Sequence, residues 1–440
     1  MRNAIVYISI LLLQLLNVMP LWSAILTFQF VCILQLLFWS KNEITYLTLI
    51  SNLAIFQWLI GPLVYYSDYN PGMVLEITQM QVGFHEYFTY AWPATSLLVI
   101  GLQLSKPNLT VDLSLLKNAD SKRFKFLIVF GLFFNIISIF SPLSLRFILK
   151  ILTYLIYVGL LGLLIKEKKT KNDISWICIV SIFVVFSALK SAMFGELVFL
   201  ILLFLLIFFY IYKTSTKRKL ILGVSVILLG TSIQLVKMPL RKLNRDGATS
   251  TLQNLFTLYN SNLLTKQNLF SESFRAYSIA RFNNGAVISY VINRVPNIIP
   301  YANGNTIGSA IVGSFIPRLI WPSKETSGTA MYLKYTGLRF EGASYGISIL
   351  GEGYANFGKR GGILYMFLLG LTISILLRRI IKYINKNPYY FYFLPIIFLH
   401  GVKVETELNR SLGFMLRVIV VLYLLNFILK KISNNRYYLY

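Results

Sequence analysis

The stretch Glu196-Leu-Val-Phe-Leu-Ile-Leu-Leu-Phe-Leu-Leu-Ile-Phe-Phe-Tyr-Ile-Tyr212 decides the fold class of this chain. It carries no charge after Glu196, and Lys213 follows it directly. A helix rises 1.5 Å per residue, so about 20 apolar residues cross the hydrocarbon core of a bilayer. The stretch therefore predicts a membrane-spanning helix.

Similar apolar runs recur along the whole chain. Of its 440 residues, 56% are hydrophobic and only 13% are charged, whereas soluble proteins carry about 25% charged residues. We expect an all-α polytopic membrane protein with about twelve transmembrane helices. The predicted spans are 3–19, 21–39, 44–66, 87–103, 125–141, 146–165, 175–193, 196–212, 220–237, 361–377, 389–405 and 411–429.

The basic residues predict the topology. The net charge is +26, but Lys and Arg lie mostly between the apolar runs, so membrane topology explains them better than nucleic-acid binding does. With the N-terminus inside, the inner segments are rich in Lys and Arg, whereas the short outer connections hold only Arg146, Lys403 and Arg410. This excess follows the positive-inside rule and places both termini in the cytoplasm.

One long connection divides the chain into three parts. Residues 1–237 would hold nine helices, 238–360 an extracytoplasmic loop, and 361–440 three helices and the C-terminus. Counted from Lys237, the loop has fourteen Lys or Arg and five acidic residues. We expect a helix at about 271–293, a turn at Asn303-Gly304, and Trp321, Tyr332 and Tyr335 at headgroup depth.

Familiar cofactor and metal motifs are missing from the sequence. Cys32 and Cys178 lie in apolar runs, and His85 and His400 have no metal-ligand pattern around them. We expect no metal and no cofactor. The segment from His400 to Arg417 is unusually rich in charge, and its Glu407 and Arg410 have the spacing of an ion pair. Charged groups in spans are costly, by about 2.5–3.5 kcal/mol each, so they are functional candidates.

Two stretches resemble a known family. They are Phe315-Ile-Pro-Arg-Leu-Ile-Trp-Pro-Ser-Lys324 and Gly351-Glu-Gly-Tyr-Ala-Asn-Phe-Gly358, late in a large outer loop and just before a span. Their order, spacing and topology resemble the O-antigen polymerase (Wzy) family. Related polymerases often carry an Arg in a mid-chain helix, where this chain has Lys190. Lys cannot make the bidentate contact of Arg with a phosphate.

The resemblance implies a glycosyltransferase of the bacterial inner membrane, similar in fold to the GT-C enzymes. Its substrate would be an undecaprenyl-pyrophosphate-linked oligosaccharide, polymerised at the outer face into O-antigen or capsular polysaccharide. A chain-length regulator and a flippase would be its partners.

The reaction suggests which residues act. A departing pyrophosphate needs Arg, and we favour Arg281 and Arg318. The sugar hydroxyl needs a general base, and Glu352 between two glycines is the first choice. Further contacts to substrate are expected from Arg241, Arg245, Arg275, Lys324, Tyr354, Asn356, Lys190, Arg410 and Arg417. A salt bridge from Glu352 to Arg318 or Arg360 is the structural alternative.

Three other functions remain open. An O-antigen ligase shares the helix count and the basic outer loop. A polysaccharide flippase or transporter usually has short loops and internal repeats, which this chain lacks. A non-catalytic membrane scaffold predicts that alanine at Arg281, Arg318 or Glu352 changes stability only.

Overall fold

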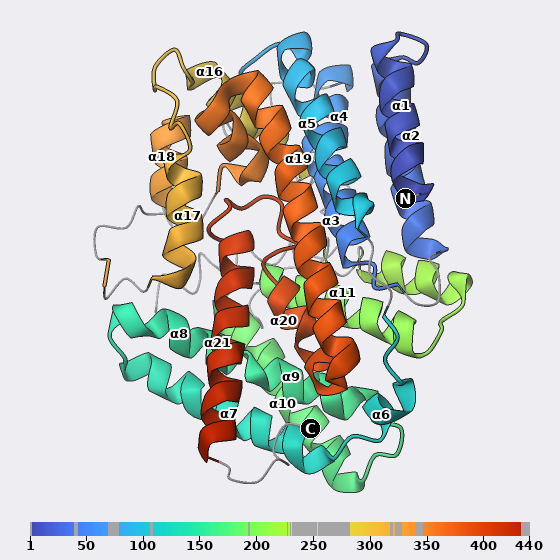
Figure 1. Cartoon of the computed structure of the whole chain (residues 1–440), viewed down its shortest axis with the longest axis vertical. Helices are drawn as coiled ribbons and strands as arrows, with labels where there is room; N and C mark the ends of the chain where they lie inside the picture. Colours follow the sequence, from blue (N-terminus) through green and yellow to red (C-terminus); the bar gives the residue numbers. More distant parts are fainter. Residues whose placement is uncertain are drawn as a thin grey trace. The chain divides into compact units, whose positions relative to one another are not determined.

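We describe the protein from a computed structural model in which all described regular elements are helical (Figure 1). The structure describes residues 2–38, 43–68, 79–105, 109–191, 194–226, 228, 230, 253, 282–316, 320–321, 328–338 and 346–432. The chain forms two compact units, which are treated separately below. Unit 1 comprises 1–111, 141–148 and 280–440, and unit 2 comprises 112–140 and 149–279.

Unit 1 contains both ends of the chain. Its N-terminal helices are α1 (Arg2–Leu15), α2 (Leu21–Leu37), α3 (Tyr46–Ile55), the π-helical turn η1 (Phe56–Ile60), α4 (Gly61–Asp68) and α5 (Phe84–Leu104). Its later elements are α16 (Gly285–Arg294), α17 (Asn305–Phe315), α18 (Thr329–Thr336), α19 (Ser348–Lys386), η4 (Pro388–Phe393), α20 (Leu394–Phe398) and α21 (Leu412–Ile432).

Unit 2 is built mainly from the middle of the chain. Its described helices are α6 (Leu113–Lys117), α7 (Ser121–Phe140), α9 (Leu155–Ile165), α10 (Lys171–Ser191) and α11 (Phe194–Ile211). Helix α8 (Leu143–Thr153) carries the chain from one unit into the other. Gly159 and Gly162 of α9 allow close packing on α7, because a β-carbon at either position would collide with Phe124.

Six helical segments are long and apolar enough to cross a membrane within the described ranges. They are Tyr46–Ser67, Ser121–Phe140, Leu145–Ile165, Lys171–Lys190, Phe194–Ile211 and Ser348–Lys386. The prediction of a helical membrane protein is therefore supported by length and composition. Half of the predicted helix 220–237 lies outside the described residues, as do 238–252, 254–281, 317–319, 322–327 and 339–345.

The predicted span 389–405 is wrong in its second half. The helix formed by η4 and α20 ends at Phe398, and residues 399–411 form turns instead. Six of these eleven helical residues are 3₁₀-helical, and together they reach about 20 Å, well short of the roughly 30 Å of a bilayer core. The residues beyond Phe398 carry several charges, and one of them, Glu407, bonds to Gly328 in another segment. We call residues 399–411 the connecting segment.

Helix α19 begins inside the predicted outer loop and folds back on itself. Gly358 interrupts it with φ +64° and ψ −163°, a backbone region almost restricted to glycine. A β-carbon at Gly362 would lie 3.2 Å from the carbonyl carbon of Gly353, although nine residues of straight helix span about 13 Å. The arm Ser348–Phe357 therefore packs against the start of the long arm. The two arms form a helical hairpin.

The two tyrosines that we expect at headgroup depth, Tyr332 and Tyr335, face the protein interior. Both are buried in a cluster with Val291, Val295 and Ile347, which joins α16, α18 and the start of α19. Tyrosine side chains bury a large apolar surface, so these rings hold the described part of the loop together instead of anchoring it to lipid.

Candidate functional site

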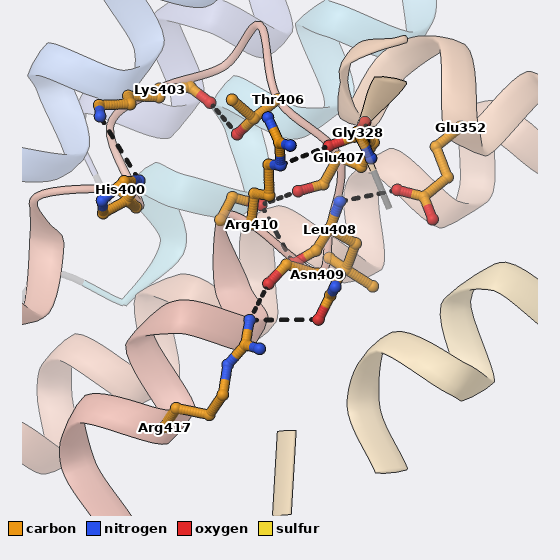
Figure 2. Close-up of polar contacts among 11 residues, drawn as sticks. Gly328, Glu352, His400, Lys403, Thr406, Glu407, Leu408, Asn409, Arg410 and Arg417 are labelled. Carbon is orange, nitrogen blue, oxygen red and sulfur yellow. Dashed lines mark hydrogen bonds and ion pairs between the residues drawn. The ribbon is translucent and has the colours of Figure 1, made fainter. Parts of the chain in front are cut away.

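Glu352 lies at the centre of the candidate site, on the short arm of the α19 hairpin. Its side chain is only 1% exposed. The Thr306 hydroxyl at the start of α17 donates to its Oε1 at 2.8 Å. The backbone N–H of Leu408 in the connecting segment donates to its Oε2 at 2.7 Å (Figure 2). One carboxylate therefore joins three segments that are distant in sequence.

Asn356 determines the direction of these hydrogen bonds. Its Nδ2 donates to the carbonyl of Glu352 at 2.8 Å and to Thr306 Oγ1 at 2.7 Å, while its Oδ1 accepts from the N–H of Gly304 at 3.0 Å. Because Thr306 Oγ1 accepts from Asn356, its own hydrogen is free to point at Glu352. The Thr306 hydroxyl and the Leu408 N–H thus both donate a hydrogen to Glu352. Two donors match an ionised carboxylate.

The sequence Gly351-Glu-Gly-Tyr-Ala-Asn-Phe-Gly358 forms this hairpin arm and its reversal. A β-carbon at Gly353 would lie 2.7 Å from the ring of Tyr365 on the long arm. The half-buried Tyr354 packs edge-on against Tyr90 of α5, with ring centroids 5.0 Å apart. The Tyr90 hydroxyl in turn donates to the carbonyl of Leu350 at 2.7 Å. Gly353 therefore allows close approach of the two arms, and the contacts of Tyr90 fix the short arm in place.

A second buried carboxylate, Glu407, lies in the connecting segment next to Arg410 (Figure 2). Its Oε1 accepts from the N–H of Gly328, the N-cap of α18, at 2.9 Å, and its Oε2 is 3.8 Å from Arg410 Nε. The expected pairing of Glu407 with Arg410 is confirmed, although it forms in a turn and not in a helix. The guanidinium of Arg410 lies against Gly328, where a β-carbon would collide with it.

Glu407 predicts a pH dependence of stability. Burial raises its pKa above the ordinary value, and the Arg410 charge and the Gly328 N–H oppose this shift. Its contribution to folding stability is therefore fully present below the ordinary glutamate pKa of about 4.3, and it is lost as the pH rises through the raised folded pKa. Glu407→Gln should flatten this dependence in thermal unfolding of the detergent-solubilised protein.

Alanine at the same position should behave differently. Glu407→Ala leaves the buried N–H of Gly328 without its acceptor, which costs about 1–3 kcal/mol. Glu86→Gln, on an exposed position of α5, is the control and should leave the unfolding curves unchanged. A Glu407→Gln variant that keeps the full pH dependence would show that another group is responsible.

Arg417 and Lys403 are largely occupied within the protein. Arg417 Nε donates to the carbonyl of Gly413 at 2.8 Å, and its Nη2 donates to both the backbone and side-chain oxygens of Asn409. Its guanidinium also lies 4.5 Å from the ring centroid of Phe147. Lys403 is nearly buried, with its Nζ 3.4 Å from His400 Nδ1. Arg417 therefore fixes the connecting segment to α21.

Of the other predicted site residues, some lie within the described ranges and some outside them. Lys190 is exposed near the end of α10 and belongs to unit 2, whereas Glu352 belongs to unit 1. Arg360 is exposed just after the hairpin turn. Outside the described residues lie the remaining predicted contacts, Arg241, Arg245, Arg275, Arg281, Arg318 and Lys324.

Sequence reasoning missed Thr306, Leu408 and Gly328 as neighbours of the two carboxylates. Two sequence signals lay near them: the Glu407–Arg410 spacing, and the turn at Asn303-Gly304, which is confirmed by positive φ angles of 49° and 86°. Leu408 contributes its backbone, which no side-chain pattern can indicate. Within the described ranges, no group of three or more His, Cys, Asp or Glu side chains is placed to hold a metal ion.

Over the described ranges these features define a class of protein: a helical chain whose longer helices are apolar enough to cross a membrane, with a buried, polar connecting segment between two of its apolar helices. Neither family models, nor curated proteins, nor solved structures gave a match to it.

Proposed function

We propose that this protein is a membrane glycosyltransferase that polymerises lipid-linked oligosaccharide repeat units. The observation that carries the proposal is the geometry of the Gly351–Gly358 stretch, on which the family resemblance rests. Glu352 and Asn356 form one hydrogen-bond network there, while Gly353 and Gly358 allow the arm to fold back. The residues shared with the family pattern thus act as one unit in space.

The proposed reaction moves a growing glycan from its lipid pyrophosphate to a sugar hydroxyl. The bond between the anomeric carbon and pyrophosphate breaks, a bond to the acceptor oxygen forms, and the acceptor proton passes to Glu352. Because Glu352 is 1% exposed, the segments packed around it must move apart before the acceptor hydroxyl can reach the carboxylate. The carboxylate oxygens can accept from this hydroxyl as well as from Thr306 and Leu408.

The leaving pyrophosphate requires cations. Arg410 is the candidate within the described site, because 35% of its side chain is exposed and it belongs to the same connecting segment as Leu408. Its guanidinium can make two parallel bonds to phosphate oxygens. Arg281 and Arg318 remain predictions for the same role, with Arg241, Arg245, Arg275 and Lys324 as further contacts. In this scheme the fold is a GT-C-like helical membrane fold.

A lipid-linked glycan flippase is the second candidate, and one observation favours it. Transporters often place their substrate sites at interrupted helices inside the membrane, where non-helical backbone is shielded from lipid. The α19 hairpin and the buried connecting segment have this character. The two candidates differ in where the repeat units accumulate when the protein is lost.

The test is deletion of the gene in its native host, followed by electrophoresis of the surface polysaccharide. Loss of the ladder with a single repeat still attached to its acceptor is the expected result for a polymerase. Full-length polymer that stays on the lipid carrier would instead indicate a ligase. Repeat units trapped on the cytoplasmic leaflet would identify a flippase and refute the polymerase.

A further inference from the structure

Three connections of unit 2 meet at one end of its helices: the one between α6 and α7, the one between α9 and α10, and the one that follows α11. The N–H of Glu167, after α9, donates to the carbonyl of Lys117 at the end of α6 at 3.1 Å. The hydroxyl of Tyr212, after α11, donates to the carbonyl of Ile165 at 3.1 Å. The ammonium of Lys117 lies over the Tyr212 ring, 5.3 Å from its centroid. These contacts tie segments that are far apart in sequence.

Asp173 is the buried centre of this end. Its side chain is fully buried, with Oδ1 2.7 Å from Lys125 Nζ and Oδ2 3.0 Å from Lys166 Nζ. Lys166 also donates to the Ser121 hydroxyl at 3.2 Å, and the N–H of Thr170 donates to Asp173 Oδ2 at 3.0 Å. One acidic charge is thus shared by two lysines and joins α7 to α10.

The surface around this centre is strongly basic. Two of its exposed acids, Asp112 and Asp120, accept from backbone N–H groups at 2.9 and 3.0 Å, and Glu167 is the third. Exposed cations outnumber these acids and come from all three connections: Lys122, Lys168, Lys169, Lys171, Lys213, Lys217 and Arg218. We call these seven residues the basic end of unit 2.

Exposed apolar side chains lie close to these charges in the chain. Tyr212 is 47% exposed, Leu115 of α6 is 58% exposed, and Leu220 is 53% exposed. Tyr with its polar tip is typical of the layer between headgroups and hydrocarbon. Basic residues directly beyond apolar helices attract anionic lipids electrostatically. The combination fits a headgroup layer better than it fits bulk water.

We propose that the basic end of unit 2 binds the phosphate groups of anionic phospholipids, and that Asp173 organises this surface. Lys125 and Lys166 hold the ends of α7 and α10 together through Asp173. The exposed lysines at these two helix ends are therefore kept in a fixed arrangement. The inference is independent of the proposed glycosyltransferase activity, because it uses no residue of the Glu352 site.

The experiment measures lipid binding by the full chain purified in detergent. Native mass spectrometry would compare phosphatidylglycerol with phosphatidylcholine for the wild type and for a triple variant carrying Lys168→Ala, Lys169→Ala and Lys171→Ala. The triple variant should bind phosphatidylglycerol about tenfold or more weakly, given the usual contribution of each cation near an anionic surface. Phosphatidylcholine binding should not change.

A matched control removes three exposed cations from unit 1, with Arg378→Ala, Arg379→Ala and Lys382→Ala on α19. Its phosphatidylglycerol binding should fall severalfold less than that of the first triple variant. An equal loss in both triple variants would overturn the proposal, because binding would then follow total charge. Competition by glycerol phosphate or by short RNA at equal phosphate concentration would also overturn it, since either would show that the lipid is not the specific partner.

Asp173→Asn separates an organised surface from simple attraction. This variant raises the net charge by one, so unspecific electrostatics predicts tighter binding to phosphatidylglycerol. Our proposal predicts weaker binding by severalfold, because Lys125 and Lys166 lose the carboxylate that holds them. Thermal unfolding in the presence of phosphatidylcholine identifies variants that remain folded. Tighter binding by folded Asp173→Asn would refute the organising role.

Discussion

Glu352→Gln is expected to abolish the polysaccharide ladder while the protein remains in the membrane. Loss of a general base commonly lowers rates about 10²- to 10⁴-fold. The amide has one acceptor oxygen, whereas the Thr306 hydroxyl and the Leu408 N–H both donate to Glu352. The NH₂ group of the new glutamine must therefore face either the Thr306 hydroxyl or the Leu408 N–H, and that donor loses its acceptor. Complementation of the deletion strain, with membrane levels measured by immunoblotting, is the assay.

Glu352→Ala should also destabilise the fold. It leaves the N–H of Leu408 and the hydroxyl of Thr306 without their acceptor, at about 1–3 kcal/mol for each buried group. The exposed Glu86→Gln is the matched control and should restore the full ladder. A full ladder from Glu352→Gln would exclude Glu352 as the proton acceptor.

Thr306 variants distinguish chemistry from structure at the same site. Thr306→Ser keeps the hydroxyl that Asn356 directs towards Glu352, so it should retain most activity. Thr306→Val removes the hydroxyl at nearly the same volume and should lower activity and stability together. Equal activity of both variants would show that the Asn356–Thr306 contact has no part in positioning Glu352.

Gly358→Ala is expected to have the largest effect on stability among single glycine changes in the hairpin turn. At φ +64° and ψ −163° an L-residue is strained by about 1–3 kcal/mol. The new methyl group would also lie 2.9 Å from the Tyr301 hydroxyl. Because the turn sets the position of the Glu352 arm, the ladder should be lost as well. Thermal unfolding in detergent and complementation measure the two effects.

Gly308→Ala is the control for this change. Gly308 lies in α17, and a β-carbon there meets nothing within 4 Å. Alanine in a helix is favoured over glycine by roughly 0.5–1 kcal/mol, so this variant should be as stable as the wild type or slightly more stable. Equal stability of Gly358→Ala and Gly308→Ala would show that the hairpin does not depend on Gly358.

The sequence was sufficient where one physical requirement dominates. The apolar run at 196–212 forms α11, Phe194–Ile211. The backbone N–H and C=O groups of such a run find no water in a bilayer, so they must bond to one another within a helix. Local chemistry was equally direct at Asn303-Gly304, where both residues adopt the positive φ that a tight turn needs. Both predictions rest on contacts between residues that are near in the chain.

The predicted span 389–405 shows where this reasoning stops. Hydropathy counts apolar residues, but it cannot show that Glu407 will find a partner in another segment. Gly328 supplies its N–H to Glu407 from 79 positions away, and this contact is available only in a turn of suitable shape. The helix therefore ends at Phe398 and the charged residues leave it.

The sequence by itself determined that the chain is helical and apolar, and it indicated Glu352 as a residue of interest. Only the tertiary structure decided what surrounds Glu352. Its partners Thr306 and Leu408 are 46 and 56 residues away, and one of them acts through its backbone. Such contacts depend on the fold-back at Gly358 and on the path of the connecting segment. Both arise from packing among helices, which no periodicity along a single segment encodes.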